Sequence, residues 1–371
     1  MSDYRLADYQ MRSAPLLRVP MGASAPQGMA LSELLNLAGT SLDELFADMP
    51  LSYAASQGDA DLRALISQDY PGLQADNIVL FAGANEAIFS VNQVLLQAGD
   101  KVQGITPAYE PLLLGARRAG ALLDTVSMAF IDGQWQLDVA HWLEKISPLT
   151  RMAVINFPHN PTGCLLSRMQ LNMMVDHCRN MDVWLFSDEV FRGLEYQAAD
   201  QLPAVASVYE KGISLGVMSK ALGFGGIRIG WVACQDQQLI QRLLAFKQWL
   251  SVCHGQADAR LALLAMQHKS EIIDSNRQLI SENLQTLQQA QVYNQFFQAR
   301  LPTAGCVMFP QLHDMGEVDP FVNDLLEQTG VMLIPGQCFL QGQQHVRLGF
   351  GRKDFPRALA GLEHYLACAA E

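Results

Sequence analysis

Short, mostly apolar segments of strand length alternate with longer amphipathic segments through the middle of the chain. Residues 151–156 and 183–186 are two such segments, and polar or turn-forming residues follow each of them. Between them, Ser167 and Gln170 have the spacing of a capping box, which predicts a helix that ends near Asn180. Strands that alternate with helices in this way predict a parallel sheet with right-handed crossovers.

The same alternation extends along the rest of the chain. Further strands are predicted over residues 77–81, 101–105, 212–217, 331–335 and 344–350, and further helices over 86–96, 237–249, 258–268, 269–289 and 356–369. We therefore predict an α/β fold with a large domain over residues 45–270, built on a mostly parallel sheet flanked by helices. Residues 271–371 would form a smaller α+β domain, and residues 1–44 an N-terminal arm that belongs to it.

The composition indicates a large folded protein. Half of the 371 residues are hydrophobic and 17% are charged, so a sizeable core is expected. The net charge of -12 argues against nucleic acid or an anionic membrane as partner. No apolar run reaches the roughly 18 residues that span a bilayer, and the N-terminal residues resemble neither a signal nor a transit peptide. We expect a cytoplasmic location.

Cysteine and histidine usage gives no sign of a metal site. The seven cysteines are widely scattered without a CxxC pair, and the eight histidines show no HExxH spacing. This pattern predicts reduced thiols and no bound metal.

Candidate functional residues follow several of the predicted strands. In parallel sheets, ligands bind beyond the carboxyl ends of the strands. One pocket is therefore expected to collect the residues that directly follow strands, namely Gly83, Tyr109, Asn160, Asp188 and Lys220. Of these, Gly83 lies in a small-residue turn before a helix, where free backbone N–H groups favour an anion.

The segment 218–231 carries the most specific chemistry. Lys220 follows a buried strand, and Arg228 lies eight residues later beyond three glycines. Burial or a nearby cation turns a lysine into a nucleophile toward carbonyls, and an arginine on a glycine-rich turn suits a phosphate. These are the requirements of a lysine that holds pyridoxal 5′-phosphate (PLP) as a Schiff base. For a Ser-Lys pair alone, an exposed loop lysine is the commoner explanation.

In combination, these segments resemble the class I/II aminotransferases, a family of fold-type I PLP-dependent enzymes. The resemblance keeps the family's order from Tyr53 to Arg347. It rests on Tyr53 with Gly58 and Leu62-Arg63, residues 82–88, Pro107 to Tyr109, Asn160 to Gly163, Ser187 to Glu189, Ser219-Lys220 with Arg228 to Trp231, and Val346 to Leu348.

The resemblance implies a role for each matching residue at the cofactor ring. Lys220 would form the Schiff base and move a proton during the reaction. Asp188 would pair with the pyridine nitrogen, Asn160 would bond the ring's phenolic oxygen, and Tyr109 would stack on one ring face.

Other matching residues would hold the cofactor phosphate and the substrate. The phosphate would be bound by Arg228 and by the backbone of Gly83, Ala84 and Asn85. Tyr53 would reach the phosphate of the neighbouring subunit, which implies a homodimer. The substrate carboxylate would be clamped by Arg347, with Asn160 and Gly22 also at the substrate.

Three positions depart from the family's pattern. Phe191 stands where a tyrosine is usual, so one hydroxyl donor to the ring oxygen is missing. Val217 stands where a phosphate-binding serine is common. Gln248 falls near the place of the arginine that reads a side-chain carboxylate in aspartate aminotransferases, so a dicarboxylic substrate is not supported.

The activity that follows from the resemblance is amino-group transfer between a small α-amino acid and a 2-oxo acid. A PLP-dependent lyase or cyclase, for example of the capreomycidine-synthase-like kind, is the alternative, because the same scaffold serves all of these reactions. A PLP-sensing regulator would need a basic DNA-binding segment, and the sequence before Tyr53 shows none.

Overall fold

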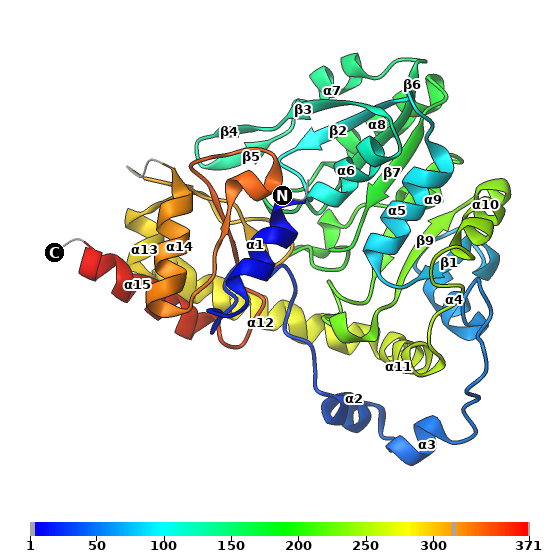
Figure 1. Cartoon of the computed structure of the whole chain (residues 1–371), viewed down its shortest axis with the longest axis horizontal. Helices are drawn as coiled ribbons and strands as arrows, with labels where there is room; N and C mark the ends of the chain where they lie inside the picture. The colour runs from blue at the N-terminus through cyan, green and yellow to red at the C-terminus, as the bar shows by residue number, and fades with distance from the viewer. Residues whose placement is uncertain (1–3, 314–316, 370–371) are drawn as a thin grey trace.

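A seven-stranded sheet forms the centre of the larger part of the molecule (Figure 1). The computed structural model describes residues 4–313 and 317–369. From one edge of the sheet to the other, the strands are β1 (Ile78–Phe81), β9 (Gly230–Cys234), β8 (Gly212–Val217), β7 (Trp184–Asp188), β6 (Thr150–Asn156), β2 (Lys101–Thr106) and β3 (Leu122–Ser127).

The sheet is mostly parallel, as predicted. The pairs β8/β7, β7/β6, β6/β2 and β2/β3 are parallel, whereas β9 runs antiparallel to both β1 and β8. The sequence pattern predicts no strand at β9, because this short segment begins inside the glycine-rich motif. Since β9 is antiparallel to both β1 and β8, these two strands point the same way, and their carboxyl ends lie at the same end of the sheet as those of the other parallel strands.

Helices cover both faces of this sheet (Figure 1). They include α4 (Ala60–Ser67), α5 (Ala84–Leu95), α6 (Glu110–Arg118), α7 (Val139–Lys145), α8 (Arg168–Asn180), α9 (Val205–Val208), α10 (Gln237–Lys247) and α11 (Gln256–Gln267). The short hairpin β4 (Ala129–Ile131) and β5 (Gln134–Gln136) lies beside them. The predicted capping box is confirmed, because Ser167 and Gln170 bond each other's backbone N–H at the start of α8.

The chain continues with α12 (Lys269–Gln289), a helix whose bounds match the prediction. The elements that follow are α13 (Gln291–Gln295), β10 (Phe297–Gln298), β11 (Val307–Met308), β12 (Gln311–Leu312), α14 (Val318–Thr329), β13 (Ile334–Pro335), β14 (Val346–Gly349) and α15 (Phe355–Ala369). The strand predicted over residues 331–335 is shorter in the structure, because Val331 forms only an isolated bridge with Val19.

The N-terminal segment packs against both parts through three helices, α1 (Arg5–Ser13), α2 (Leu31–Ala38) and α3 (Leu42–Phe46). The sequence pattern gives little sign of α1, since its nine residues are mostly polar. It is held by tertiary contacts instead: Leu6 and Tyr9 are buried, and the Tyr9 hydroxyl donates to the carbonyl oxygen of Leu333.

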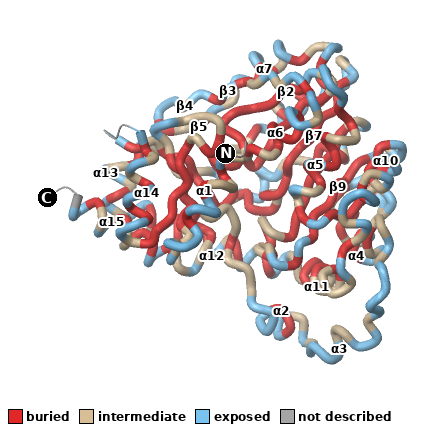
Figure 2. Tube along the Cα trace, viewed as in Figure 1, coloured by how far each residue is buried: buried red, intermediate tan, exposed pale blue. Residues whose placement is uncertain are grey.

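The helices α2 and α3 extend away from the sheet, and the segment that leads from them to α4 is largely exposed (Figure 2). No described helix is long and apolar enough to cross a membrane. The domain boundaries after residues 44 and 270 stay a prediction. Residues 1–3, 314–316 and 370–371 of those domains lie outside the described part of the chain.

Candidate active site

The loops that follow β1, β2, β6, β7 and β8 meet at one edge of the sheet. These loops carry Gly83, Tyr109, Asn160 and Lys220, four of the residues selected from the sequence, and the fifth, Asp188, is the last residue of β7. The described structure therefore brings these five positions to one region, and Arg347 of β14 joins them from the smaller part of the molecule.

Lys220 lies just beyond β8, and its amine is bound by the N-terminal segment. Its Nζ donates to Ser24 Oγ at 2.7 Å and to the Ser24 carbonyl oxygen at 3.2 Å. Burial, assisted by the nearby Arg347 guanidinium, lowers the pKa of Lys220 to about 8. The amine is therefore closer to its nucleophilic, neutral form than an exposed lysine would be.

Asp188 is the last residue of β7 and is buried. One carboxylate oxygen accepts from the Val190 N–H at 3.1 Å, and the Asp188 carbonyl accepts from Asn156 Nδ2 at 2.9 Å. Burial raises the pKa of Asp188 to about 7, against the opposing effects of the Val190 hydrogen bond and of Lys220. A buried carboxyl group of this kind favours a cationic hydrogen-bond donor as its partner.

Arg347 is buried and bonds the other two predicted substrate-binding residues, Asn160 and Gly22. Its Nη1 donates to Asn160 Oδ1 at 3.0 Å, while Nη2 and Nε donate to the Gly22 carbonyl oxygen at 2.8 and 3.2 Å. Asn160 is itself fixed, since its backbone N–H donates to Asn156 Oδ1 at 2.9 Å. Burial lowers the pKa of Arg347 to about 10, so the guanidinium is still a cation at neutral pH. A buried cation of this shape suits a carboxylate.

The start of α5 and Arg228 form a candidate anion site. Gly83, with a φ of 87°, precedes α5, and no side chain caps this helix start. The Arg228 guanidinium lies directly against this helix start. Its Nη2 donates to the Ala82 carbonyl oxygen at 3.3 Å, and a Cβ on Gly83 would come within 2.3 Å of the same Nη2. Free N–H groups of Ala84 and Asn85 together with a guanidinium are suited to a phosphate.

Tyr109 is fixed between α5 and the N-terminal segment. Its hydroxyl donates to Asn85 Oδ1 at 2.9 Å and accepts from the Tyr4 hydroxyl at 2.9 Å. Burial is the main cause of the raised pKa of Tyr109. Tyr4 and Ser24 are the site neighbours that the sequence analysis missed, because neither lies in a recognisable motif.

Tyr53 is the one predicted site residue that the chain does not bring to this region. Its side chain is 88% exposed, in the segment between α3 and α4, and it lines a shallow surface hollow together with Leu51 and His254.

The structure also shows the surroundings of the three residues that depart from the family's pattern. Phe191 and Val217 are buried, and Gln248 Nε2 donates to Ser56 Oγ at 2.8 Å.

Comparison with known proteins gives the family. Residues 41–355 match the family described as Aminotransferase class I and II. The chain belongs to this family. Capreomycidine synthase of Streptomyces vinaceus is 28% identical over 89% of this chain and 83% of its own length. Aspartate aminotransferase of Pyrococcus horikoshii is 24% identical over 90% of this chain and 86% of its own.

The fold agrees with this assignment. A PLP-dependent aminotransferase from Streptococcus suis superimposes with a TM-score of 0.93 and 28% identity, over 99% of this chain and 98% of that one. The predicted fold-type I architecture is therefore confirmed, and the family implies PLP as the cofactor.

The residues present fit this cofactor. The buried carboxyl group of Asp188, with its raised pKa, has the chemistry of a partner for a protonated pyridine nitrogen. The uncapped start of α5, with Arg228 beside it, suits the phosphate. Lys220, with its lowered pKa, suits an aldehyde.

Proposed function

We propose that the protein is an aminotransferase that moves an amino group between a small α-amino acid and a 2-oxo acid. The observation that carries the proposal is the buried guanidinium of Arg347, which lies close enough to Lys220 to contribute to its lowered pKa. A substrate whose α-carboxylate binds Arg347 would bring its amino group and Cα toward Lys220. Both substrates of a transamination carry this carboxylate, so one clamp serves both halves of the reaction.

Each polar residue of the site has a task in this reaction. Bound PLP supplies an electron sink for the charge that develops at the substrate's Cα. Asp188 would hold a proton on the pyridine nitrogen, which keeps that sink effective. Lys220 would anchor the cofactor between turnovers, and its free Nζ would then move the Cα proton. Asn160 would orient both Arg347, which it already binds, and the cofactor's ring oxygen.

A lyase or cyclase on the same scaffold is the second candidate. The observation that favours it is the similarity to capreomycidine synthase, which at 28% identity exceeds the 24% of the aspartate aminotransferase. The residues named above serve either chemistry, since transamination differs from elimination or cyclisation in the bond that breaks and not in how the substrate is held.

Product analysis with isotope-labelled donors separates the two. The holoenzyme would be incubated with ¹⁵N-labelled amino acids and either pyruvate or 2-oxoglutarate, beside a Lys220→Ala control. Transamination yields a ¹⁵N-labelled new amino acid and an equal amount of the donor's 2-oxo acid. Release of labelled ammonia, or a cyclised product without transfer to the 2-oxo acid, would replace the proposal by the lyase or cyclase.

The proposed active unit is a homodimer. Exposed apolar side chains support it: Leu51 and Tyr53, which line one surface hollow, are each more than four-fifths exposed in the single chain, and so is Trp249, just after α10. Apolar groups gathered in this way are typical of an interface. A second copy of this chain would cover them and would receive Tyr53 at its phosphate site.

The protein's proposed location is the cytoplasm, a reducing compartment that suits its seven free cysteines.

A further inference from the structure

A second cavity, of about 450 Å³, lies beside the site but shares none of its predicted residues. It opens between the end of α4, the loop after β7 and the start of α12. Its wall includes Val190 and Ala221, which are close in sequence to Asp188 and Lys220. The volume is in the range of pockets that bind small molecules.

Charged side chains of both signs surround this cavity. Three acids and three bases line it, as the ion pairs Glu189–Arg192, Asp69–Lys269 and Asp274–Arg277. Two of these pairs, Glu189–Arg192 and Asp274–Arg277, are 3.6 Å apart, which is longer than a hydrogen bond. Their charged groups therefore keep capacity for a further partner.

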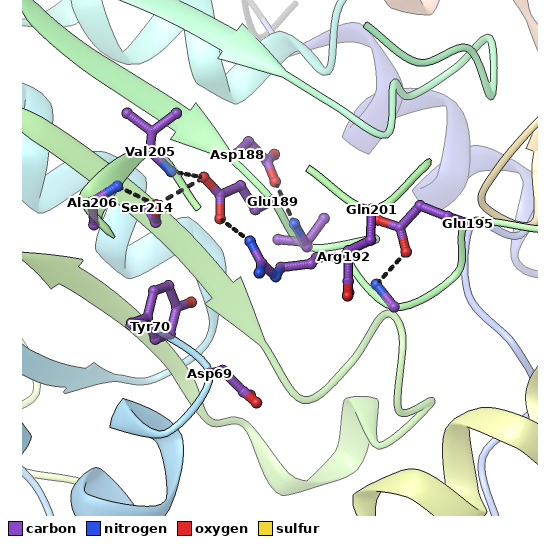
Figure 3. Close-up of polar contacts among 12 residues, drawn as sticks. Asp69, Tyr70, Asp188, Glu189, Arg192, Glu195, Gln201, Val205, Ala206 and Ser214 are labelled. Carbon is purple, nitrogen blue, oxygen red and sulfur yellow. Dashed lines mark hydrogen bonds and ion pairs between the residues drawn. The ribbon is translucent and has the colours of Figure 1, made fainter. Parts of the chain in front are cut away.

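Two polar atoms of the lining are buried and make no hydrogen bond within residues 4–313 and 317–369: Glu189 Oε2 and Arg277 Nε. Glu189 is only 7% exposed, and its other oxygen accepts from the Val205 N–H and from Ser214 Oγ (Figure 3). The side chain of Asp188 leaves the same end of β7 in another direction, so the two carboxyl groups face different surroundings (Figure 3). Glu189 Oε2, which faces Arg192 Nη1 at 3.6 Å in the ion pair, is an acceptor, and Arg277 Nε is a donor.

Apolar and aromatic groups fill the space between the charges. The indole of Trp231 lies so close over Gly216 that a Cβ there would come within 2.3 Å of the ring. Its Nε1 donates to the Tyr70 hydroxyl at 2.8 Å, which fixes the ring at the cavity wall. Met266 and Ile273 also line the cavity. An apolar lining with a few convergent polar groups is typical of a ligand site.

We propose that this cavity is a second ligand site, which binds a zwitterionic α-amino acid with an apolar side chain. The ammonium group would bond Glu189 Oε2, the carboxylate would bond Arg277 Nε and the Arg192 guanidinium, and the side chain would lie against Trp231 and Ile273. Such a ligand gives a hydrogen bond to both atoms that lack one and adds no net charge to a lining that carries equal numbers of acids and bases.

The cavity lies where α12 contacts the loop that carries Lys220. Asn276 of α12 donates to the Ala221 carbonyl oxygen at 2.9 Å, and the Ala221 N–H donates to the Val190 carbonyl oxygen at 3.3 Å. The cavity therefore lies beside a chain of hydrogen bonds that joins the loop after β7, the Lys220 loop and α12.

The test must separate this site from the substrate site, which also binds amino acids. Holoenzyme whose Lys220 linkage to the cofactor has been reduced with borohydride would be titrated with L-leucine by calorimetry. We expect one L-leucine per chain to bind in an Arg347→Gln background, in which the substrate clamp is removed. Adding Arg277→Gln should weaken this binding about tenfold or more, since a hydrogen bond to a charged group is lost.

Control variants and half-ligands complete the design. Ile273→Trp, which fills the cavity, should also abolish binding, whereas Arg357→Gln, at an exposed arginine of α15, should leave it unchanged. Butyrate and butylamine, each with one of the two charges, should bind at least tenfold more weakly than L-leucine. The proposal is overturned if no L-leucine binds in the Arg347→Gln background, if Arg277→Gln leaves the affinity unchanged, or if either half-ligand binds as well.

Discussion

The amine of Lys220 donates a hydrogen bond to Ser24 Oγ at 2.7 Å, although 196 residues separate the two in sequence. The acceptor belongs to the N-terminal segment, which also supplies the Gly22 carbonyl oxygen to Arg347. One short stretch of chain thus contacts both the expected nucleophile and the expected carboxylate clamp. The ionisation of Lys220 should therefore depend on Ser24.

Reconstitution of the apoprotein with PLP tests this dependence. Only the neutral amine attacks the aldehyde, so with a Lys220 pKa of about 8 the rate should rise with pH and level off above that value. Ser24→Ala removes an acceptor that favours the ammonium form and should move the midpoint down by about one pH unit. Ser24→Thr, which keeps the hydroxyl, should retain the wild-type midpoint. An unchanged midpoint in Ser24→Ala would contradict the assignment.

Asp188 should destabilise the apoprotein at neutral pH. Its pKa is raised from 3.8 to about 7 in the folded state, so the folded chain binds more protons than the unfolded chain between these values. Stability therefore falls as pH rises through that window, and the cost is fully present above about pH 7. Asp188→Asn should stabilise the apoprotein at pH 8 by on the order of 2 kcal/mol and have little effect at pH 4.

Urea unfolding of the apoprotein at the two pH values measures this difference. The same variant should bind PLP more weakly than wild type, because the partner of the pyridine nitrogen is lost. A variant that is less stable than wild type at pH 8, or that retains full PLP affinity, would show that Asp188 has a structural role instead.

Replacement of Arg347 should act on substrates through their carboxylate. Arg347→Lys keeps the charge but loses the planar pair of donors, so KM for the amino acid should rise about 10- to 100-fold. The effect should vanish for an amine that lacks the carboxylate. Arg352→Lys is the matched control, since Arg352 is ion-paired with Asp354. Steady-state kinetics with both substrates would decide, and an equal loss with the amine would argue against a carboxylate clamp.

Mixed dimers test the proposed role of Tyr53. A Tyr53→Ala chain and a Lys220→Ala chain should each be nearly inactive alone if Tyr53 serves the partner's site. After unfolding and refolding together, random pairing should restore roughly a quarter of the wild-type activity, because each mixed dimer has one intact site. Sedimentation would verify that dimers form. No recovery in dimers of verified mixed composition would mean that Tyr53 acts within its own chain.

The elements predicted best from the sequence are those whose own residues show a recognisable pattern, such as an apolar run, a capping box or a helical period. The apolar run 212–217 matches β8, the capping box at Ser167 marks the start of α8, and the periodic segment 269–289 matches α12. Residues placed after strand ends also gather as expected, since parallel strands bring their carboxyl ends to one edge.

What the sequence did not predict depends on partners far along the chain. Helix α1 is mostly polar, and the backbone N–H of Leu6 within it is held by the buried carboxylate of Glu110. Strand β13 is only two residues long, and both residues pair with β14. Ser24 is an ordinary loop serine until the fold brings Lys220 to it. No local pattern can show such contacts, because their stability comes from packing.

The contact between Gly22 and Arg347 also sets an order of events during synthesis. The two residues are 325 apart, so at about 5 to 20 residues per second the ribosome adds Arg347 roughly 15 to 65 seconds after Gly22. Throughout that interval the segment around Ser24 lacks β14, the strand that carries Arg347. A nascent chain stopped before Arg347 therefore carries Lys220, Asp188 and Asn160 but lacks Arg347, so the hydrogen bonds from Arg347 to Gly22 and Asn160 form only near the end of synthesis.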